Sequence, residues 1–351
     1  MTKTSHMNAA QIQQALEAGI ISASQAKSMH DALEQTSDRL NWDTAHIGDE
    51  ENLRFLRRFS DIFLAIGLSI LGLGAAGLVN LLGGGIVNWF AAGACLIFAL
   101  YFGRRKRAHL PTLVLALAFL IFVQAGASAL FGGSGTIAAL LTLAAMGLFY
   151  YFIRLPFCIA LIALASLYLV FALIRYSLPG ALPVHTGVVL MVCGTIIFVI
   201  ALIYDSKDFQ RKTRFSDNAF WLHFLAAPMI IHGFAIGAIR NKVDIAFGFV
   251  PIVDIDRSDA ILVLILVGII ALIGLAINRR GMIVSSLGYA AFSLIYLMGG
   301  TGLGFSGVLV ASLILLGASI VLLGVVWHRL RDILLTILPK WKIFPPAFKE
   351  D

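Results

Sequence analysis

Two histidines and a proline interrupt an apolar stretch in the second half of the chain. His223 and His232 lie in residues 220–233, with Pro228 between them. Imidazole exchanges protons near neutral pH, and a proline inside a helix removes a backbone hydrogen bond and bends the axis. The two histidines are nine residues apart, so on a straight helix they face opposite sides and do not share a metal ion. The pattern predicts a proton relay or a substrate contact around a kinked helix.

Two other interpretations of these histidines remain open. One is an aromatic and histidine anchor at the membrane interface, combined with a histidine that hydrogen-bonds to a neighbouring helix. The other is a haem or metal ligand. In each case we expect His223 near the inner interface and His232 in the outer half of the helix.

Hydroxyl side chains form a second pattern, at spacings of three and four residues that place them on one helix face. They are Ser286, Tyr289, Ser293 and Tyr296. Such a stripe either lines a pathway or packs against small residues. Gln124, with Ser128 one turn further, is either a substrate contact or an amide that bonds across helices, as buried amides do in membranes.

Acidic residues alternate at 254, 256 and 259, as they do in calcium-binding loops. The glycine and the distal glutamate of such loops are absent, so a solvated loop is favoured, with Ser258 or Asp259 capping the next helix. We find no nucleophile with a neighbouring base, no Cys-x-x-Cys and no phosphate-binding loop. We therefore predict no catalytic residue, no metal site, no cofactor and no enzymatic activity.

The composition explains where these polar residues must sit. Hydrophobic residues make up 60% of the chain and charged residues only 13%, whereas soluble domains average about 25% charged. A helix needs about 20 apolar residues to cross a bilayer. We predict an all-α, polytopic membrane protein with ten spans, at about 61–82, 86–102, 111–131, 136–153, 157–174, 185–204, 219–239, 259–278, 282–298 and 303–326.

The basic residues predict the orientation of these spans. With ten spans, 22 of the 26 Lys and Arg residues fall on the side of the N-terminus. The other side holds Arg175, Arg240, Lys242 and Arg257. Because cytoplasmic loops are enriched in Lys and Arg, we expect both termini in the cytoplasm. The basic residues lie between apolar segments, so we expect membrane lipids, and no nucleic acid, as partners.

Three segments lie outside the spans in this interpretation. Residues 1–58 form a cytoplasmic helical hairpin, at 8–35 with a capping box from Ser22 to Gln25, and then a charged linker. So short a hairpin does not bury a core of its own, so it requires self-association or a protein partner. Residues 59–327 form the membrane domain, and residues 328–351 an amphipathic interfacial tail. Residues 245–253 are too short to span and are expected to re-enter the membrane or lie on it.

The hairpin sequence Leu-Glu-Ala-Gly-Ile-Ile-Ser-Ala-Ser-Gln-Ala at residues 16–26 precedes a charged linker and many spans. This arrangement resembles the uncharacterised bacterial multi-pass inner-membrane proteins with a short helical N-terminal domain of unknown function. The stretch at 220–232 is similar to a segment of such proteins. The resemblance implies a bacterial inner (cytoplasmic) membrane location, and it transfers no functional residue.

Two functions follow as expectations. Ten spans divide into five and five, and an odd-numbered repeat is inverted, as in many secondary carriers. The first expectation is therefore a transporter or permease-like protein of unknown substrate, with Gln124, His223, Pro228, His232 and the hydroxyl stripe as its pathway. The alternative is a membrane-embedded sensor, scaffold or assembly factor that acts through the N-terminal hairpin.

Overall fold

The computed structural model describes residues 12, 15–18, 20–22, 24–29, 59–131, 135–208, 211, 213–238, 243–246, 250–253, 257–299 and 301–338. The chain divides into two compact units, Met1–Asn52 and Leu53–Asp351. In the first unit, residues 24–29 are helical. The predicted capping box is confirmed there: Ser22 N donates to Gln25 Oε1 at 2.9 Å, and Gln25 N donates to Ser22 Oγ at 3.3 Å. The rest of the predicted hairpin and linker lies outside the described residues.

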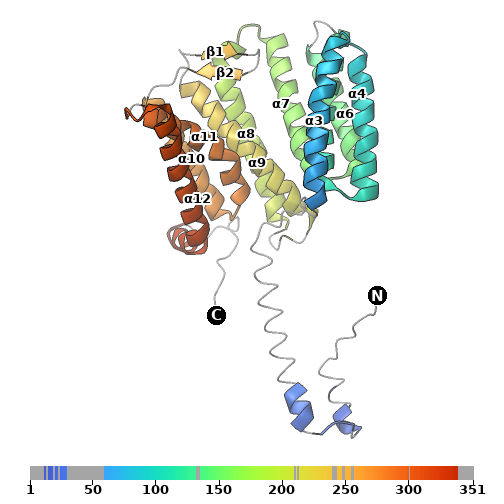
Figure 1. Cartoon of the computed structure of the whole chain (residues 1–351), viewed down its shortest axis with the longest axis vertical. Coiled ribbons are helices and arrows are strands. Elements are labelled where there is room, and N and C mark those ends of the chain that lie inside the picture. The colour runs from blue at the N-terminus through green and yellow to red at the C-terminus, as the bar shows by residue number, and fades with distance from the viewer. Residues whose placement is uncertain are drawn as a thin grey trace. The chain divides into compact units, whose positions relative to one another are not determined.

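The second unit is a bundle of helices (Figure 1), and the predicted all-α membrane fold is confirmed. Its described part holds ten helices long and apolar enough to cross a membrane. A six-residue π-helix, η1 (Tyr101–Lys106), extends the second of them. The helices are α3 (Phe59–Leu81), α4 (Val87–Leu100), α5 (His109–Phe131), α6 (Gly135–Ile153), α7 (Phe157–Ser177), α8 (Leu182–Ser206), α9 (Arg214–Ala238), α10 (Arg257–Ala276), α11 (Arg280–Gly299) and α12 (Gly304–Ile337).

The segment between α9 and α10 contains a small antiparallel hairpin that the sequence did not predict. Strands β1 (Val243–Ala246) and β2 (Val250–Val253) pair with Val243 opposite Val253 and Ala246 opposite Val250. The hairpin lies at the end of the bundle where α9 ends and α10 begins (Figure 1). Pairing of the two strands satisfies backbone N–H and C=O groups of this segment. In a re-entrant loop, the same groups would need other hydrogen-bond partners.

The last helix differs from its predicted boundary. We expected the tenth span to end at residue 326 and a separate interfacial tail to begin at 328. Instead α12 runs without a break through Trp327 to Ile337. Its 34 residues are about 51 Å long, against roughly 30 Å of hydrocarbon. The sequence between 326 and 330 contains no glycine or proline that would end a helix. Residues 339–351 of the predicted tail lie outside the described residues.

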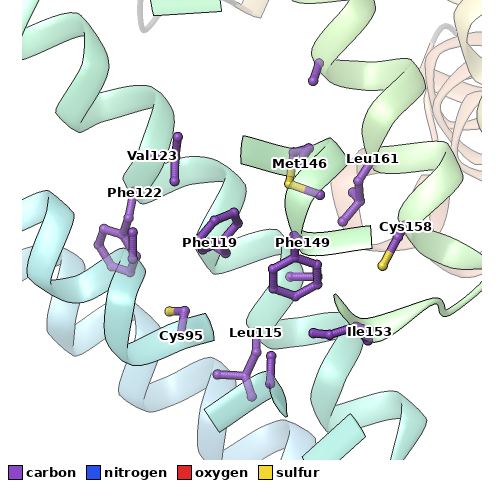
Figure 2. Close-up of a cluster of buried hydrophobic side chains, with 14 of the residues drawn as sticks. Cys95, Leu115, Phe119, Phe122, Val123, Met146, Phe149, Ile153, Cys158 and Leu161 are labelled. Carbon is purple, nitrogen blue, oxygen red and sulfur yellow. The ribbon is translucent and has the colours of Figure 1, made fainter. Parts of the chain in front are cut away.

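A core of aromatic and aliphatic side chains holds the first five spans together (Figure 2). Phe119 of α5 and Phe149 of α6 meet at its centre, with their ring centroids 4.9 Å apart. Cys95 of α4 and Cys158 of α7 lie in the same cluster and are buried. The outward face of the bundle is apolar as well, as expected for a surface in contact with lipid, with exposed side chains such as Leu73.

The most extensive contact between two helices joins α8 and α9. It is a backbone-to-backbone contact at glycine. A Cβ atom on Gly187 would lie 2.6 Å from Gly233 O, and one on Gly233 would lie 2.6 Å from Met191 N. Small residues permit this close approach, which is how helices associate in membranes where apolar surfaces gain little from meeting. The pair forms a rigid element that carries Asp205 at the end of α8 and His223 and His232 on α9.

The neighbours of each helix do not follow the expected division into five and five. If the chain consisted of two five-helix repeats, α8 and α10 would correspond to α3 and α5. Helices α3 and α5 pack on each other, but α8 and α10 make no comparable contact. The contacts recur after four helices instead. α5 packs on α3, α4, α6 and α7, and α9 packs on α7, α8, α10 and α11. An even offset keeps the direction of each helix, so this recurrence is parallel and not inverted.

Candidate functional site

An acidic side chain, a histidine and an arginine meet at one end of the second half of the bundle. Asp205 is in the last turn of α8, His223 is in α9, and Arg279 is in the turn between α10 and α11. His223 Nε2 lies 2.8 Å from Asp205 Oδ2, and Arg279 Nε donates to the same oxygen at 3.2 Å. Arg279 Nη2 donates to Asp205 Oδ1 and, at 3.0 Å, to Ser216 Oγ. We call these four residues the Asp205 cluster.

The turn that carries Arg279 is shaped by the end of α10. Asn278 adopts the left-handed conformation (φ 56°), and Arg279 N donates back to Gly274 O at 2.6 Å, which closes the helix end. Two side chains from other elements then hold Asn278. Arg211 of the α8–α9 connection donates to its carbonyl, and Trp327 Nε1 of α12 donates to its Oδ1 at 3.0 Å. The position of Arg279 therefore depends on the end of α10, on the α8–α9 connection and on helix α12.

The cluster is almost closed to solvent. The His223 side chain is fully buried, Arg279 is 3% exposed, and Asp205 is 16% exposed. A carboxylate between an arginine and a histidine offsets the cost of burying the guanidinium charge. His223 Nδ1 is also buried, and it has no hydrogen-bond partner among the described residues. The cluster is electrically neutral when His223 is neutral, and gains one positive charge when His223 binds a proton.

His232 and Tyr289 form a second polar group, between α9 and α11. Their ring centroids are 6.1 Å apart, and Tyr289 Oη donates to Pro228 O at 3.3 Å. His232 is half-buried, and no hydrogen bond to its ring is found in the described part of the chain. As predicted, Pro228 lies inside the helix. Three of the residues expected to form a pathway, Pro228, His232 and Tyr289, are therefore in one place, about one and a half to two and a half turns beyond His223.

The remaining members of the hydroxyl stripe have different surroundings. Ser286 is buried and donates to Ile283 O of its own helix at 2.8 Å. Ser293 is buried, and its hydroxyl has no hydrogen-bond partner within the described ranges. Tyr296 is 38% exposed on the outside of the bundle. The stripe is thus not a continuous polar surface: Tyr289 contacts α9, Ser286 and Ser293 are buried, and Tyr296 is exposed.

Gln124 lies away from both groups, among the first five spans. Its Oε1 accepts a hydrogen bond from Thr142 Oγ1 of α6 at 2.7 Å, and its Nε2 donates to Ser128 Oγ at 2.9 Å. These bonds join α5 to α6, which is the interhelical role that the sequence left open as an alternative to substrate contact. No described contact links Gln124 to His232 or Tyr289.

Sequence reasoning found His223 but missed the residues that bind it. Arg279 was counted only among the basic residues that predict the orientation, and Asp205 was not singled out because it follows the predicted end of its span at residue 204. The positions of Asp205 and Arg279 in the sequence could have indicated this pairing. Asp205 lies inside the helix that the apolar segment forms, and Arg279 directly precedes the next one. With short connections, the ends of successive hairpins meet, so opposite charges at such ends are expected to pair.

The predicted acidic loop is only partly described. Asp254 and Asp256 lie outside the described residues, and Asp259 lies in the first turn of α10, which begins at Arg257. Within the described ranges, no three His, Cys, Asp or Glu side chains lie close enough together to hold a metal ion. The chain was also compared with protein-family models, with curated proteins and with solved structures, and it matches none of them.

Proposed function

We propose that this integral membrane protein is a transporter in which protonation of His223 is coupled to the movement of substrate. The observation that carries the proposal is the Asp205 carboxylate, which His223 and Arg279 share at oxygen Oδ2. A histidine in this position changes the charge of a network that joins three parts of the bundle. Intramembrane ionisable residues of this kind are characteristic of proton relays in pumps and transporters.

The geometry gives protonation a mechanical consequence. A neutral His223 shares Asp205 Oδ2 with Arg279 without competing in charge. A protonated His223 places a second cation beside the same carboxylate, and the electrostatic hold of Asp205 on Arg279 is then divided between two partners. Since Asp205 is on α8, His223 on α9 and Arg279 before α11, the proton alters how firmly these helix ends are tied together. If the cluster served only to stabilise the fold, the Asp205–Arg279 ion pair would be sufficient.

The test uses purified protein in liposomes. A pH jump across the membrane is applied, and the proton current is recorded. We expect a current for the wild type and a loss of about tenfold or more for His223→Gln, a loss that corresponds to about 1.4 kcal/mol or more. The glutamine amide can still donate to Asp205, so the Asp205–Arg279 pair remains. His185→Gln is the matched control, since His185 is exposed at the opposite end of α8.

Two results would oppose the proposal. One is a wild-type protein that carries no proton current with or without a panel of solutes on one side. The other is a His223→Gln protein that conducts like wild type while Asp205→Ala only lowers thermal stability. The second result would mean that the Asp205 cluster only stabilises the fold.

A second function, that of a sensor, scaffold or assembly factor, is favoured by one feature of the N-terminal unit. Ile20, next to the confirmed capping box, is 76% exposed. Met29 of the same unit is exposed as well, and so small a unit does not bury a core of its own, so contact with another protein or another copy would cover these side chains. Deletion of residues 1–58 should then abolish the recovery of a partner while the spans still insert. Equal recovery of partners by the deleted and the full-length chain would count against it.

A further inference from the structure

Helices α9 and α11 carry polar side chains whose hydrogen bonds are not satisfied by the described part of the protein. Ser293 shows this most clearly. Many other hydroxyls in the spans donate to a carbonyl three or four residues earlier in their own helix, including those of Ser69, Ser166, Ser285, Ser286 and Ser319. Ser312 of α12 is, like Ser293, a buried serine whose hydroxyl has no partner among the described residues. Ser293 is as buried as Ser286 but makes no such bond. A buried polar group without a partner in an apolar bundle indicates a missing water or ligand.

His232 and Tyr289 also have hydrogen-bonding capacity that no described residue uses. His232 makes no hydrogen bond to any described residue, and the Tyr289 hydroxyl uses its proton on Pro228 O and keeps its lone pairs unused. α9 and α11 run in the same direction because one span, α10, lies between them. Tyr289 is level with Pro228, so one turn further along both helices Ser293 comes level with His232. On this register, Pro228, His232, Tyr289 and Ser293 lie within about one turn of one another along the two helices.

Among the described residues, this stretch carries no charged side chain. On α9 and α11 the charged residues lie at the end that holds the Asp205 cluster, namely Arg214, Asp217 and Arg280. On the helices packed against them, Arg175 of α7 and Arg257 and Asp259 of α10 lie at the opposite ends of their spans. In α8, the charged residue is Asp205, in its last turn. In α12, Arg329, Arg331 and Asp332 lie beyond Trp327. A charged ligand at mid-depth would find no counter-charge, which makes its burial costly.

We propose that Pro228, His232, Tyr289 and Ser293 form the binding site of a small uncharged solute that both donates and accepts hydrogen bonds. The imidazole and the serine hydroxyl each supply a donor and an acceptor, and the Tyr289 oxygen supplies a further acceptor. The inference rests on the proposed transport function, for which it names the class of substrate: a neutral polar molecule, and not an ion.

The test measures access of thiol reagents that differ in charge. The three native cysteines, Cys95, Cys158 and Cys193, form no disulfide and are replaced by alanine. A single cysteine is then introduced at Ser293 or, as the matched control, at Phe292, which is 52% exposed on the lipid-facing side of the same turn. The probes are neutral methyl methanethiosulfonate, its cationic trimethylammonium-ethyl analogue and its anionic sulfonatoethyl analogue, and modification is followed by intact-protein mass spectrometry.

We expect Ser293→Cys to react with the neutral reagent about tenfold faster than Phe292→Cys, because only a hydrated thiol ionises and reacts. Both charged reagents should leave Ser293→Cys unmodified. If Ser293→Cys lowers thermal stability too far, His232→Cys replaces it. A Ser293→Cys rate equal to that of Phe292→Cys would mean a dry contact and overturn the proposal. Equal rates with all three reagents would overturn the uncharged class.

The labelling is performed at one pH without a gradient, so it does not depend on proton coupling. If Ser293→Cys is not labelled but the protein conducts protons, the proposed solute site is wrong and the proposed transport function stands. If Ser293→Cys is labelled but the protein carries no proton current, the proposed function is wrong and the solute site stands. His223→Gln should not change the labelling rates, because His223 is not one of the four residues.

Discussion

At the scale of single residues, Asp205 organises the cluster around it. Its two oxygens accept from Arg279 and face His223, and Arg279 in turn donates to Ser216. Arg279 is therefore buried with one carboxylate as its counter-charge in the cluster. The free energy of each group depends on the presence of the other, so substitutions of the two are not additive.

This dependence gives a prediction for stability. Asp205→Ala should lower the free energy of unfolding by about 3–5 kcal/mol, because it removes the carboxylate that the buried Arg279 guanidinium and His223 both bind. The double variant Asp205→Ala, Arg279→Ala should be more stable than Asp205→Ala alone, since the buried guanidinium that lost this carboxylate is then removed as well. Thermal unfolding in detergent, followed by tryptophan fluorescence, measures both. Losses that simply add in the double variant would show that the pair is not coupled.

What the sequence could predict at this scale is limited by how far apart the partners are. His223 was identified because a histidine in an apolar segment is unusual wherever its partners are. Its hydrogen bond to Asp205 depends on how α8 lies on α9, and that depends on Gly187 and Gly233, whose close contact no local pattern indicates. Ser293 could not be separated from Ser286 either, because both are buried on one helix face and differ only in the direction of the hydroxyl.

At the scale of elements, the α8–α9 contact is the one most sensitive to a single methyl group. Gly233→Ala would place a carbon 2.6 Å from the backbone nitrogen of Met191, and neither helix backbone can move locally to relieve it. We expect a loss of about 1–3 kcal/mol in the free energy of unfolding, as for other overpacked sites. Gly74→Ala in α3 is the control, since no described atom of a neighbouring element lies within 4 Å of the position that its methyl group would take. A Gly233→Ala protein as stable as Gly74→Ala would contradict the close approach.

The long helix α12 leads to another prediction at this scale. Trp327→Phe keeps an aromatic ring for Arg280, whose guanidinium carbon lies 5.2 Å from the Trp327 ring centroid, but removes the hydrogen bond to Asn278. Leaving Asn278 Oδ1 without this donor should cost about 1–3 kcal/mol. Hydrogen exchange measured by mass spectrometry should then rise at residues 275–281 and in the last turns of α12. Exchange that stays unchanged at 275–281 would mean that α12 does not hold this turn.

The sequence predicted the elements better than their ends. Uninterrupted apolar runs and the short connections at 83–85 and 154–156 are local features, and they placed the ends of the spans within about five residues, except for the end of α12. The end of α12 was misplaced because the change from an apolar to an amphipathic sequence at Trp327 was taken as a change of element. A helix can continue through such a change when nothing in the sequence breaks it.

At the scale of the whole membrane unit, backbone conformation differs between its two sides. Residues in the left-handed conformation occur in connections on both sides of the bundle. Among the described residues, those on the side with few basic residues are all glycine: Gly83, Gly84, Gly85, Gly180, Gly302 and Gly304. On the side rich in Lys and Arg they are Arg107, Arg154, Arg211 and Asn278. Glycine adopts this conformation without the steric cost that a side chain adds.

This difference bears on the orientation in the membrane. An arginine in a left-handed turn is unfavourable by about 1–2 kcal/mol relative to glycine on steric grounds. Arginine at three such turns, all on one side, is understandable if basic charge is required on that side, as it is in the cytoplasm. These arginines belong to the distribution of Lys and Arg that predicts the orientation. In the predicted orientation, the Asp205 cluster lies near the cytoplasmic face and the proposed solute site lies deeper in the membrane.

Labelling of two engineered cysteines tests this orientation. Three spans, α5, α6 and α7, separate Arg105 from Leu178, so the two residues must lie on opposite sides of the membrane. In the cysteine-free background, a membrane-impermeant maleimide added to bacterial spheroplasts should label Leu178→Cys at once. It should label Arg105→Cys only after the membrane is opened, because the positive side faces the cytoplasm. The reverse result would invert the protein and place the Asp205 cluster at the outer face, where protons would then enter His223 from outside. Labelling of both before opening would mean that an odd number of spans does not separate them, and the ten-span arrangement itself would have to be abandoned.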